Sequence, residues 1–452
     1  MKRFLLIAKF LLAASVTTLS QGVAINNTAA AANASAMLDV SSPNKGMLIP
    51  RVSTASRKAI ANPATGLFVF DSTEKTLYMY DGHHWLGFAA LTEMQRPTSN
   101  FMYGPDVQDT TLAGYSVSVW DQFAAIGVPY KKIGNLFTGG VYIYKIAAGQ
   151  WQYITTLTPT GNNDASSFGS TLCLKGNFLV VGAPNHKNAF AQVVGAAYIY
   201  NYNGTSWINT QTIFGTTPNN NFAQQVAVNQ FGNQLAISET GATVSGIAGA
   251  GIINVYNKPS SSFVLQTTVH DPLPGVGENF GSSLAMSPAG NYMLVGAPAK
   301  TVSGHYGSGY IGLYFRSGAS WTETHTLAPP PQNGLHLGGS VALTDNYAVF
   351  SYGKSVSMLD FTWFGYESVF TNDVYSVAID PVSEMYYVFS GTNLYSGYSA
   401  AAVKLKTFGF DGSNAFPQLL SIYNKNYVIG NPISADVAMP YAGAFYFGTS
   451  QY

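Results

Sequence analysis

Short apolar runs alternate with turn residues in the stretch Phe280 to Pro298, which reads FGSSLAMSPAGNYMLVGAP. Ser282 to Met286 alternates small or polar positions with apolar ones, which is the period of a half-buried strand. Pro288 to Asn291 supplies a turn, because Pro presets one backbone angle and Gly tolerates positive φ. Tyr292 to Val295 is an apolar run that is too short for a helix. The pattern therefore predicts two strands joined by a turn.

The same pattern recurs along the chain. Copies begin at Gly114 (GYSVSVWDQFAAIGVP), Phe168 (FGSTLCLKGNFLVVGAP) and Phe222 (FAQQVAVNQFGNQLAIS). Self-similarity with a period of about 50 residues is typical of a propeller or a solenoid. We therefore expect the chain from about residue 101 onward to be one repeat array.

Each full copy offers four strands, which in the second copy are expected at Ser170 to Leu174, Phe178 to Val181, Gly195 to Tyr200 and Trp207 to Phe214. A large aromatic ring opens each fourth strand, and we expect it to cover the gap to the next blade, because such rings bury much area at low entropic cost. These rings are Trp151, Trp207, Phe263 and Trp321.

Three later copies are weaker and closer together: Leu337 to Ser351, Tyr375 to Ser390 and Gln418 to Pro432. Their shorter spacing predicts that some outer strands are short or missing. The last copy ends after three strands, and Phe101 to Tyr103 would supply the fourth, since a missing strand leaves an open edge. We predict an all-β, seven-bladed β-propeller over residues 101–452, closed by a strand at 101–103. Six or eight blades also fit the pattern.

The Phe-Gly opening and Gly-Ala-Pro close of two copies resemble the FG-GAP repeat, the blade unit of the integrin α-chain propeller. The matching residues are Phe168, Gly169, Gly182, Ala183, Pro184, Phe280, Gly281, Gly296, Ala297 and Pro298. In that family the turn between the first two strands often carries an Asp-x-Asp-x-Asp-Gly calcium loop. Calcium takes six to eight oxygen ligands, yet the turns at 175–177, 229–233 and 287–291 hold no carboxylate triad. We expect no bound calcium and no other cofactor.

The first residues are those of a secretory signal peptide, expected over residues 1–21. Lys2 and Arg3 form a positive start, and Phe4 to Ala14 is an apolar core interrupted by Lys9. This core is too short to span a membrane, and no later apolar run reaches about 18 residues. We expect a secreted protein without a membrane span, located outside a bacterial cell or on its outer surface.

Residues 22–92 form a different, mainly β module, with a hairpin of Leu67 to Phe70 and Leu77 to Tyr80 and a helical turn within Ala55 to Ala61. The module resembles an N-terminal segment of secreted bacterial surface proteins that is of fibre or stalk type and often trimeric, which implies a homotrimer. Residues 93–100 are expected to be a linker. The residues that carry the resemblance are Leu38, Asp39, Val40, Lys45, Gly46, Pro50, Arg51, Arg57, Ala59, Ile60, Pro63, Ala64, Thr65, Gly66, Leu67, Tyr80, Gly82 and Trp85.

The composition narrows the classes of partner. Only 9% of residues are charged, and 21 Lys and Arg balance 21 Asp and Glu. This balance argues against nucleic acid, which requires a concentrated positive field, and against anionic lipid. The lone Cys173 cannot form a disulfide within the chain, and we interpret it as a small buried apolar residue.

Catalytic signals are weak. A glycosidase propeller needs paired carboxylates at its axis, and the predicted first strands carry almost none. We interpret Glu239 and Asp380 as isolated, solvated loop acids. His83 and His84 are interpreted as a solvated pair beside Trp85, because neighbouring residues on a strand face opposite ways.

Binding is the remaining function. The loops that join second to third strands, at 130–139, 185–194, 240–250 and 299–307, should gather on one face of the ring, and loops on a rigid scaffold often carry binding sites. Aromatic and basic tips there suit an extracellular protein or glycan. The candidate residues are Tyr130, Lys131, Lys132, Phe137, His186, Lys187, Phe190, His305 and Tyr306.

The sequence thus favours a non-catalytic adhesion or recognition protein of the cell surface. Two alternatives stay open. One is an extracellular polysaccharide-acting enzyme, which needs carboxylates that converge in the channel. The other is a structural subunit of a surface layer or filament.

Overall fold

The computed structural model describes two compact units, which comprise residues 1–90 and 91–452. The expected signal peptide, His83, His84 and nearly all of the expected linker lie outside the described residues. The described residues are 22–73, 75–80, 82, 85–88, 100–102, 104–105, 111–159, 166–327, 330–361, 365–371, 374, 376–390, 393–397, 403–407, 420–431, 435–436, 439–440 and 444–449.

The first unit is a small, mainly β module. Its four-stranded sheet has the order β3 (Arg51–Val52), β4 (Phe68–Asp71), β5 (Thr76–Tyr80) and β6 (Trp85–Phe88), and β3 runs parallel to β4. The expected hairpin is the antiparallel pair β4–β5. A separate parallel pair joins β1 (Val23–Ile25) to β2 (Leu38–Val40).

A buried ion pair ties the short helix α2 (Thr54–Lys58) to this sheet. Arg57 Nε lies 3.0 Å from Asp71 Oδ2, and its guanidinium lies 3.7 Å from the centroid of the Tyr78 ring. Ser53 caps the helix, because its hydroxyl accepts a bond of 3.1 Å from the Ser56 amide. A paired charge can be buried at tolerable cost when its hydrogen bonds are satisfied, so Arg57 and Asp71 fix the helix in place.

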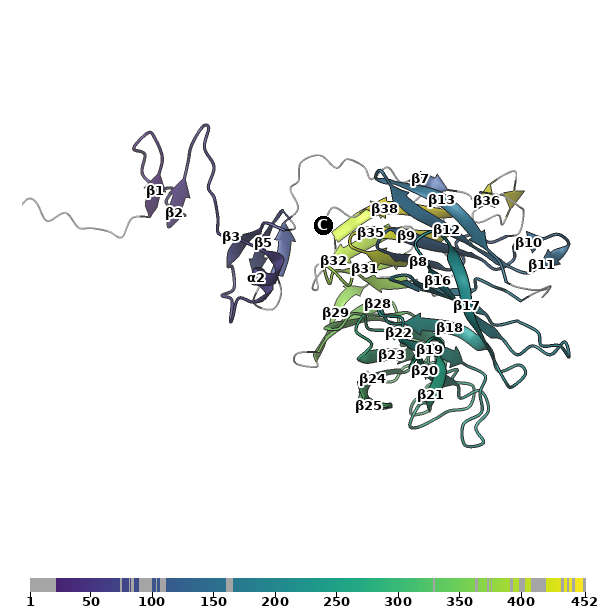
Figure 1. The fold of residues 1–452 in the computed structure, drawn as a ribbon. Coiled ribbons are helices and arrows are strands. Elements are labelled where there is room, and N and C mark those ends of the chain that lie inside the picture. Colours follow the sequence, from purple (N-terminus) through teal and green to yellow (C-terminus); the bar gives the residue numbers. More distant parts are fainter. Residues whose placement is uncertain are drawn as a thin grey trace, which may run out of the picture. The chain divides into compact units, whose positions relative to one another are not determined.

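In the second unit, the described residues form seven four-stranded antiparallel sheets (Figure 1). The first four sheets, each given from first to fourth strand, are β8 (Val117–Trp120), β9 (Phe123–Val128), β12 (Gly140–Ala147) and β13 (Gln150–Leu157); β14 (Thr171–Lys175), β15 (Phe178–Ala183), β16 (Ala196–Tyr202) and β17 (Trp207–Phe214); β18 (Phe222–Val228), β19 (Gln234–Glu239), β20 (Ile252–Asn257) and β21 (Val264–Val269); and β22 (Ser283–Met286), β23 (Tyr292–Gly296), β24 (Ile311–Ser317) and β25 (Ser320–Leu327).

The last three sheets follow the same plan. They are β26 (Val341–Leu343), β27 (Tyr347–Tyr352), β28 (Ser355–Asp360) and β29 (Gly365–Thr371); β30 (Ser376–Ile379), β31 (Tyr386–Ser390), β32 (Asn393–Gly397) and β33 (Val403–Thr407); and β34 (Leu420–Tyr423), β35 (Asn426–Asn431), β38 (Ala444–Thr449) and β7 (Asn100–Met102). Two short hairpins lie outside the sheets: β10 (Lys132–Ile133) with β11 (Leu136–Phe137), and β36 (Ala435–Asp436) with β37 (Met439–Pro440).

Each of the later sheets has its outer strand, so the expectation that some are missing is wrong, whereas the expectation that some are short is confirmed, because β33 has five residues and β7 three against eight in β13, β17 and β25. The loop between the second and third strands has also shortened. In the fifth sheet β27 ends at Tyr352 and β28 begins at Ser355, whereas in the second sheet β15 ends at Ala183 and β16 begins at Ala196. The repeat spacing therefore reports loop length and not the number of strands.

The first strands of successive sheets contact one another in the circuit β8, β14, β18, β22, β26, β30, β34 and back to β8. The cores lie between successive sheets. One core, for example, joins Phe123 of β9 to Leu172 of β14 and Tyr198 of β16. The last sheet is completed by β7, which pairs antiparallel with β38 and places Met102 opposite Phe445. The fourth strand of this sheet thus comes from the start of the unit.

The large ring that opens each fourth strand packs on the preceding sheet, and the expectation that it covers the gap to the next blade is wrong. Trp207 lies edge-on to Phe123 of the first sheet, with ring centroids 5.3 Å apart. Trp151 of the first sheet stacks on Phe447 of the last at 4.8 Å. Trp321 shares a core with Val255 of the third sheet. The right-handed twist of strands tilts the outer edge of a sheet relative to its inner strand. In this unit the outer edge of each of these sheets packs on the sheet that precedes it.

Candidate functional site

In the second unit, the loops that join second to third strands and the segments that lead from one sheet to the next lie at the same end of the strands. Strands alternate in direction within each sheet, so loops from second to third strands emerge beside the segments that lead to the next sheet. We call the segments 130–139, 185–194, 240–250, 299–307 and 270–279 together the loop face. In Figure 1 the hairpin of β10 and β11 projects at one end of the strands of this unit.

Hydrogen bonds from backbone amides tie segments of the loop face to one another and to the chain beside it. The Gly277 amide donates to the Ala248 carbonyl and the Asn279 amide to the Gly249 carbonyl, both at 3.0 Å. The Tyr306 amide donates to Asn333 Oδ1 at 2.9 Å. These bonds fix the backbone of the long loops, so the residues at the loop tips are held in defined positions.

Several candidate residues are exposed at these tips. Phe190 and Tyr306 are 84% and 74% exposed, and Tyr130 and Lys132 are also exposed. Phe190 sits on a turn in which Asn188 Oδ1 accepts its amide at 2.9 Å. Phe137, Lys187 and His305 are half-buried, and Lys132 Nζ lies 4.5 Å from the Phe137 ring centroid.

Two of the nine candidates are not at the surface, and the prediction is wrong for them. Lys131 is 5% exposed, with its Nζ 5.4 Å from the centroid of the Tyr142 ring. His186 is 8% exposed, and its Nδ1 lies 3.1 Å from the Tyr198 hydroxyl. Burial lowers the pKa of His186, which favours the neutral ring. Both side chains contact a tyrosine of the sheet that carries their loop, Tyr142 for Lys131 and Tyr198 for His186.

Leu273 and Val276, which the sequence prediction missed, are as exposed as Phe190. They lie on the segment between β21 and β22, whose two ends are anchored by buried charges. Lys300 Nζ pairs with Asp271 and lies 3.3 Å from Glu278 Oε2. Burial and the neighbouring Asp271 raise the pKa of Glu278 to about 7. The cluster spans about 30 residues of sequence, and no local motif signals it.

The interpretation of Glu239 and Asp380 as solvated loop acids is also wrong, because both are buried. Glu239 accepts bonds from the side-chain amides of Asn220 at 2.8 Å and Asn254 at 3.1 Å. Asp380 accepts the backbone amides of Asn424 at 2.8 Å and Lys425 at 3.0 Å, which belong to the next sheet. These carboxylates join segments of the fold.

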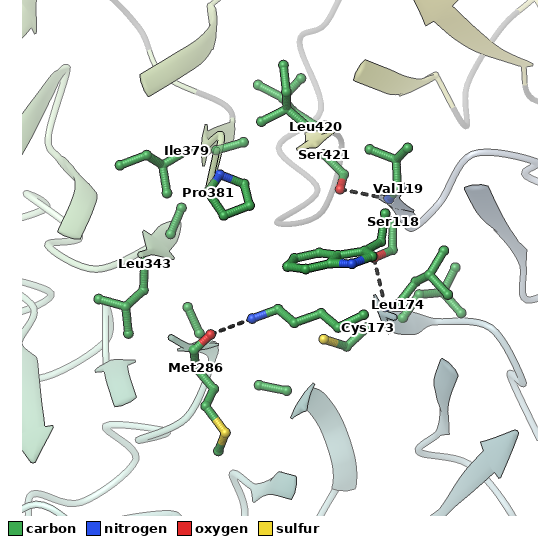
Figure 2. Close-up of a pocket in the computed structure, with 18 of the residues that line it drawn as sticks. Ser118, Val119, Cys173, Leu174, Met286, Leu343, Ile379, Pro381, Leu420 and Ser421 are labelled. Carbon is green, nitrogen blue, oxygen red and sulfur yellow. Dashed lines mark hydrogen bonds between the residues drawn. The ribbon is translucent and has the colours of Figure 1, made fainter. Parts of the chain in front are cut away.

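A cavity of about 170 Å³ lies where the first strands of the seven sheets meet. Figure 2 shows side chains from around the circuit pointing into it. The described residues that line it are mostly apolar, with Lys175, Ser118, Ser421 and Cys173 as polar groups and no carboxylate among them. Burial raises the pKa of the half-buried Cys173 thiol, which is opposite to what activates a nucleophile.

The described part of the chain contains no group of three or more His, Cys, Asp or Glu residues that could hold a metal ion. It also contains no helix that is long and apolar enough to cross a membrane.

Comparison with known proteins gives a match for each unit. A family described as "Phage tail like trimerisation region" matches residues 24–100. No curated protein matches the chain. Among solved structures, a WD40 β-propeller in the crystal structure of the mitotic checkpoint complex is 14% identical, with a TM-score of 0.50, over 78% of this chain and 91% of that one.

At that identity the structural likeness shows the fold alone. Strands make up 52% of the chain and helix 1%, so the predicted all-β class is confirmed. The likeness also supports the predicted β-propeller and its repeats.

Proposed function

We propose that this chain is a secreted bacterial surface protein in which residues 24–100 trimerise and a seven-bladed propeller of FG-GAP type presents the loop face to an extracellular protein or glycan. The proposal includes neither catalysis nor bound calcium. The observation that carries it is the pairing of a trimerisation-region match with a propeller-like unit whose ordered loops expose large apolar tips.

The surface of the first unit supports assembly. Eight large apolar side chains among the described residues of this unit are exposed, and extensive exposed apolar surface often marks a site of association. A threefold contact between copies would remove them from water, as symmetric oligomers commonly do. The exposed side chains are Val23, Ile25, Met37, Leu38, Val40, Met47, Leu48 and Phe68.

The loop face supports recognition. Aromatic residues are enriched in protein interfaces, and aromatic rings also provide flat apolar faces against which sugars can pack. Three linked copies of a weak site would raise the overall avidity by about 10²–10⁴ where the geometry allows simultaneous contact. A trimer with modest loop contacts could therefore bind a repetitive cell surface firmly.

The test is a glycan array and a cell-binding assay with the full chain, whose mass in solution is measured by light scattering. We expect a trimer that binds, and a variant with Phe190→Ser and Tyr306→Ser that binds at least about tenfold more weakly. The matched control is Phe231→Ser, because Phe231 is also exposed but lies in the turn between β18 and β19, at the opposite ends of the strands.

The two parts of the proposal fail separately. Trimers that bind no glycan and no cell surface would leave the structural alternative, a subunit of a surface layer or filament. A monomeric full chain would contradict the assembly. Equal losses from the loop-face variant and from Phe231→Ser would contradict the assignment of the loop face.

A further inference from the structure

The central cavity holds a lysine that forms no ion pair among the described residues. Lys175 ends β14, and its Nζ donates to the Met286 carbonyl at 2.6 Å, so its side chain passes the intervening first strand β18 to reach β22. An ammonium group has three donors, and this bond uses one of them. Burial lowers the pKa of Lys175, and the nearby Asp345 offsets part of this shift without pairing with the ammonium group. Its carboxylate accepts the Ala289 amide at 3.0 Å instead.

Two hydroxyl groups of the same lining are used as acceptors. Ser118 Oγ accepts the Leu174 amide at 2.9 Å, and Ser421 Oγ accepts the Val119 amide at 3.0 Å. A hydroxyl that accepts such a bond still has its proton to donate. The cavity therefore presents donors from three sheets and a positive charge, without a carboxylate among its described lining residues.

Most of the residues around these donors are apolar, although the surface that they expose to the cavity is more polar than apolar. The lining includes the aliphatic residues Val117, Leu172, Leu284 and Val341, and the Trp120 ring centroid lies 5.8 Å from Lys175 Nζ. The volume of about 170 Å³ slightly exceeds that of a protein cavity of about 150 Å³ that holds a benzene molecule. A compact organic molecule fits this space, and Lys175 is half-buried in its wall.

We propose that the central cavity binds a small monocarboxylate, with its carboxylate against Lys175 and its short apolar body against Trp120 and the aliphatic walls. One ammonium group balances one negative charge, whereas a doubly charged phosphate would leave one of its charges without a partner in a confined site with a single cation, which is costly. This site is separate from the loop face and does not depend on the function proposed for it.

The test is saturation-transfer NMR on the full chain with butyrate as the probe, and with butyramide as a neutral molecule of the same shape. We expect saturable butyrate binding with a Kd on the order of millimolar and at least about tenfold weaker binding of butyramide. Lys175→Met should abolish butyrate binding, whereas Lys404→Met, at an exposed position on β33, should leave it unchanged.

Several results would overturn the proposal: no saturable butyrate signal, equal binding of butyrate and butyramide, or undiminished binding by the folded Lys175→Met protein. Inorganic phosphate that displaces butyrate at equal concentration would overturn the choice of a monocarboxylate. If Lys175→Met does not fold, the preference of the unaltered protein for butyrate over butyramide decides the question.

Discussion

At the scale of single residues, the buried acids of this protein show how much a carboxylate depends on its neighbours. Asp380 and Glu239 are surrounded by amide donors and join segments of the fold. Glu278 lies beside both Lys300 and Asp271, and burial together with the like charge of Asp271 raises its pKa to about 7. Protons therefore bind Glu278 more readily in the folded protein than in the unfolded chain.

This difference predicts a pH dependence of stability. In the unfolded chain the pKa of Glu278 is the ordinary 4.5 of a glutamate, whereas the folded group retains its proton up to about pH 7. Its contribution to stability is complete below pH 4.5 and is lost as the pH rises to 7. We expect Glu278→Gln to reduce the loss in unfolding free energy over this window by about 1 to 2 kcal/mol.

The measurement is urea unfolding at a series of pH values, and the matched control is Glu384→Gln. For each protein the unfolding free energy is plotted against pH, and the slopes of these plots are compared. The slope reports the titration of Glu278, whereas the loss of its contact with Lys300 changes the absolute unfolding free energy. Parallel curves for the unaltered and Glu278→Gln proteins would contradict the prediction.

At the scale of elements, each sheet depends on the one before it. The rings that open the fourth strands reach the preceding core, as Trp207 does with Phe123. Side-chain to backbone bonds also cross between sheets: Gln211 Nε2 donates to the Phe263 carbonyl at 2.9 Å, and its Oε1 accepts the Phe263 amide at 2.7 Å. The sheets are therefore coupled and are expected to unfold together.

Trp207→Ala tests this coupling. Removing a buried indole leaves a cavity between the first two sheets, so we expect the unfolding free energy to fall by about 3–5 kcal/mol. The measurement is denaturant unfolding followed by circular dichroism. Ile208→Ala, at an exposed position on the same strand β17, should cost less than about 1 kcal/mol. Similar costs for the two variants would show that the ring does not bridge the sheets.

At the scale of the whole second unit, the pairing of β7 with β38 joins the two ends of the repeat array. Without β7, the outer edge of β38 would offer unpaired backbone groups to another chain. The first strands also return from β34 to β8. Closure of the circuit is therefore a property of residues about 300 positions apart, as in the bond from the Val119 amide to Ser421 Oγ.

Two truncations that differ only in the closing strand test its contribution. Residues 91–452 retain β7, and we expect them to fold with a thermal midpoint close to that of the full chain. Residues 103–452 lack β7, and their midpoint should be lower by about 3 °C or more, which corresponds to about 2 kcal/mol in a unit of about 350 residues. Equal midpoints and equal solubility would show that the strand adds nothing.

The sequence by itself determined the strands, the turns and the period, because alternation of apolar residues and turn chemistry are local. Trp207 to Phe214, for example, was placed at its observed bounds, and a closing strand was expected within one residue of Asn100 to Met102. The tertiary structure alone decided which charged and aromatic groups became buried and against what. Lys131, His186 and Asp380 are buried, and Lys175 reaches past β18 to Met286 on β22. Burial depends on elements that are distant in sequence, and no local pattern contains that information.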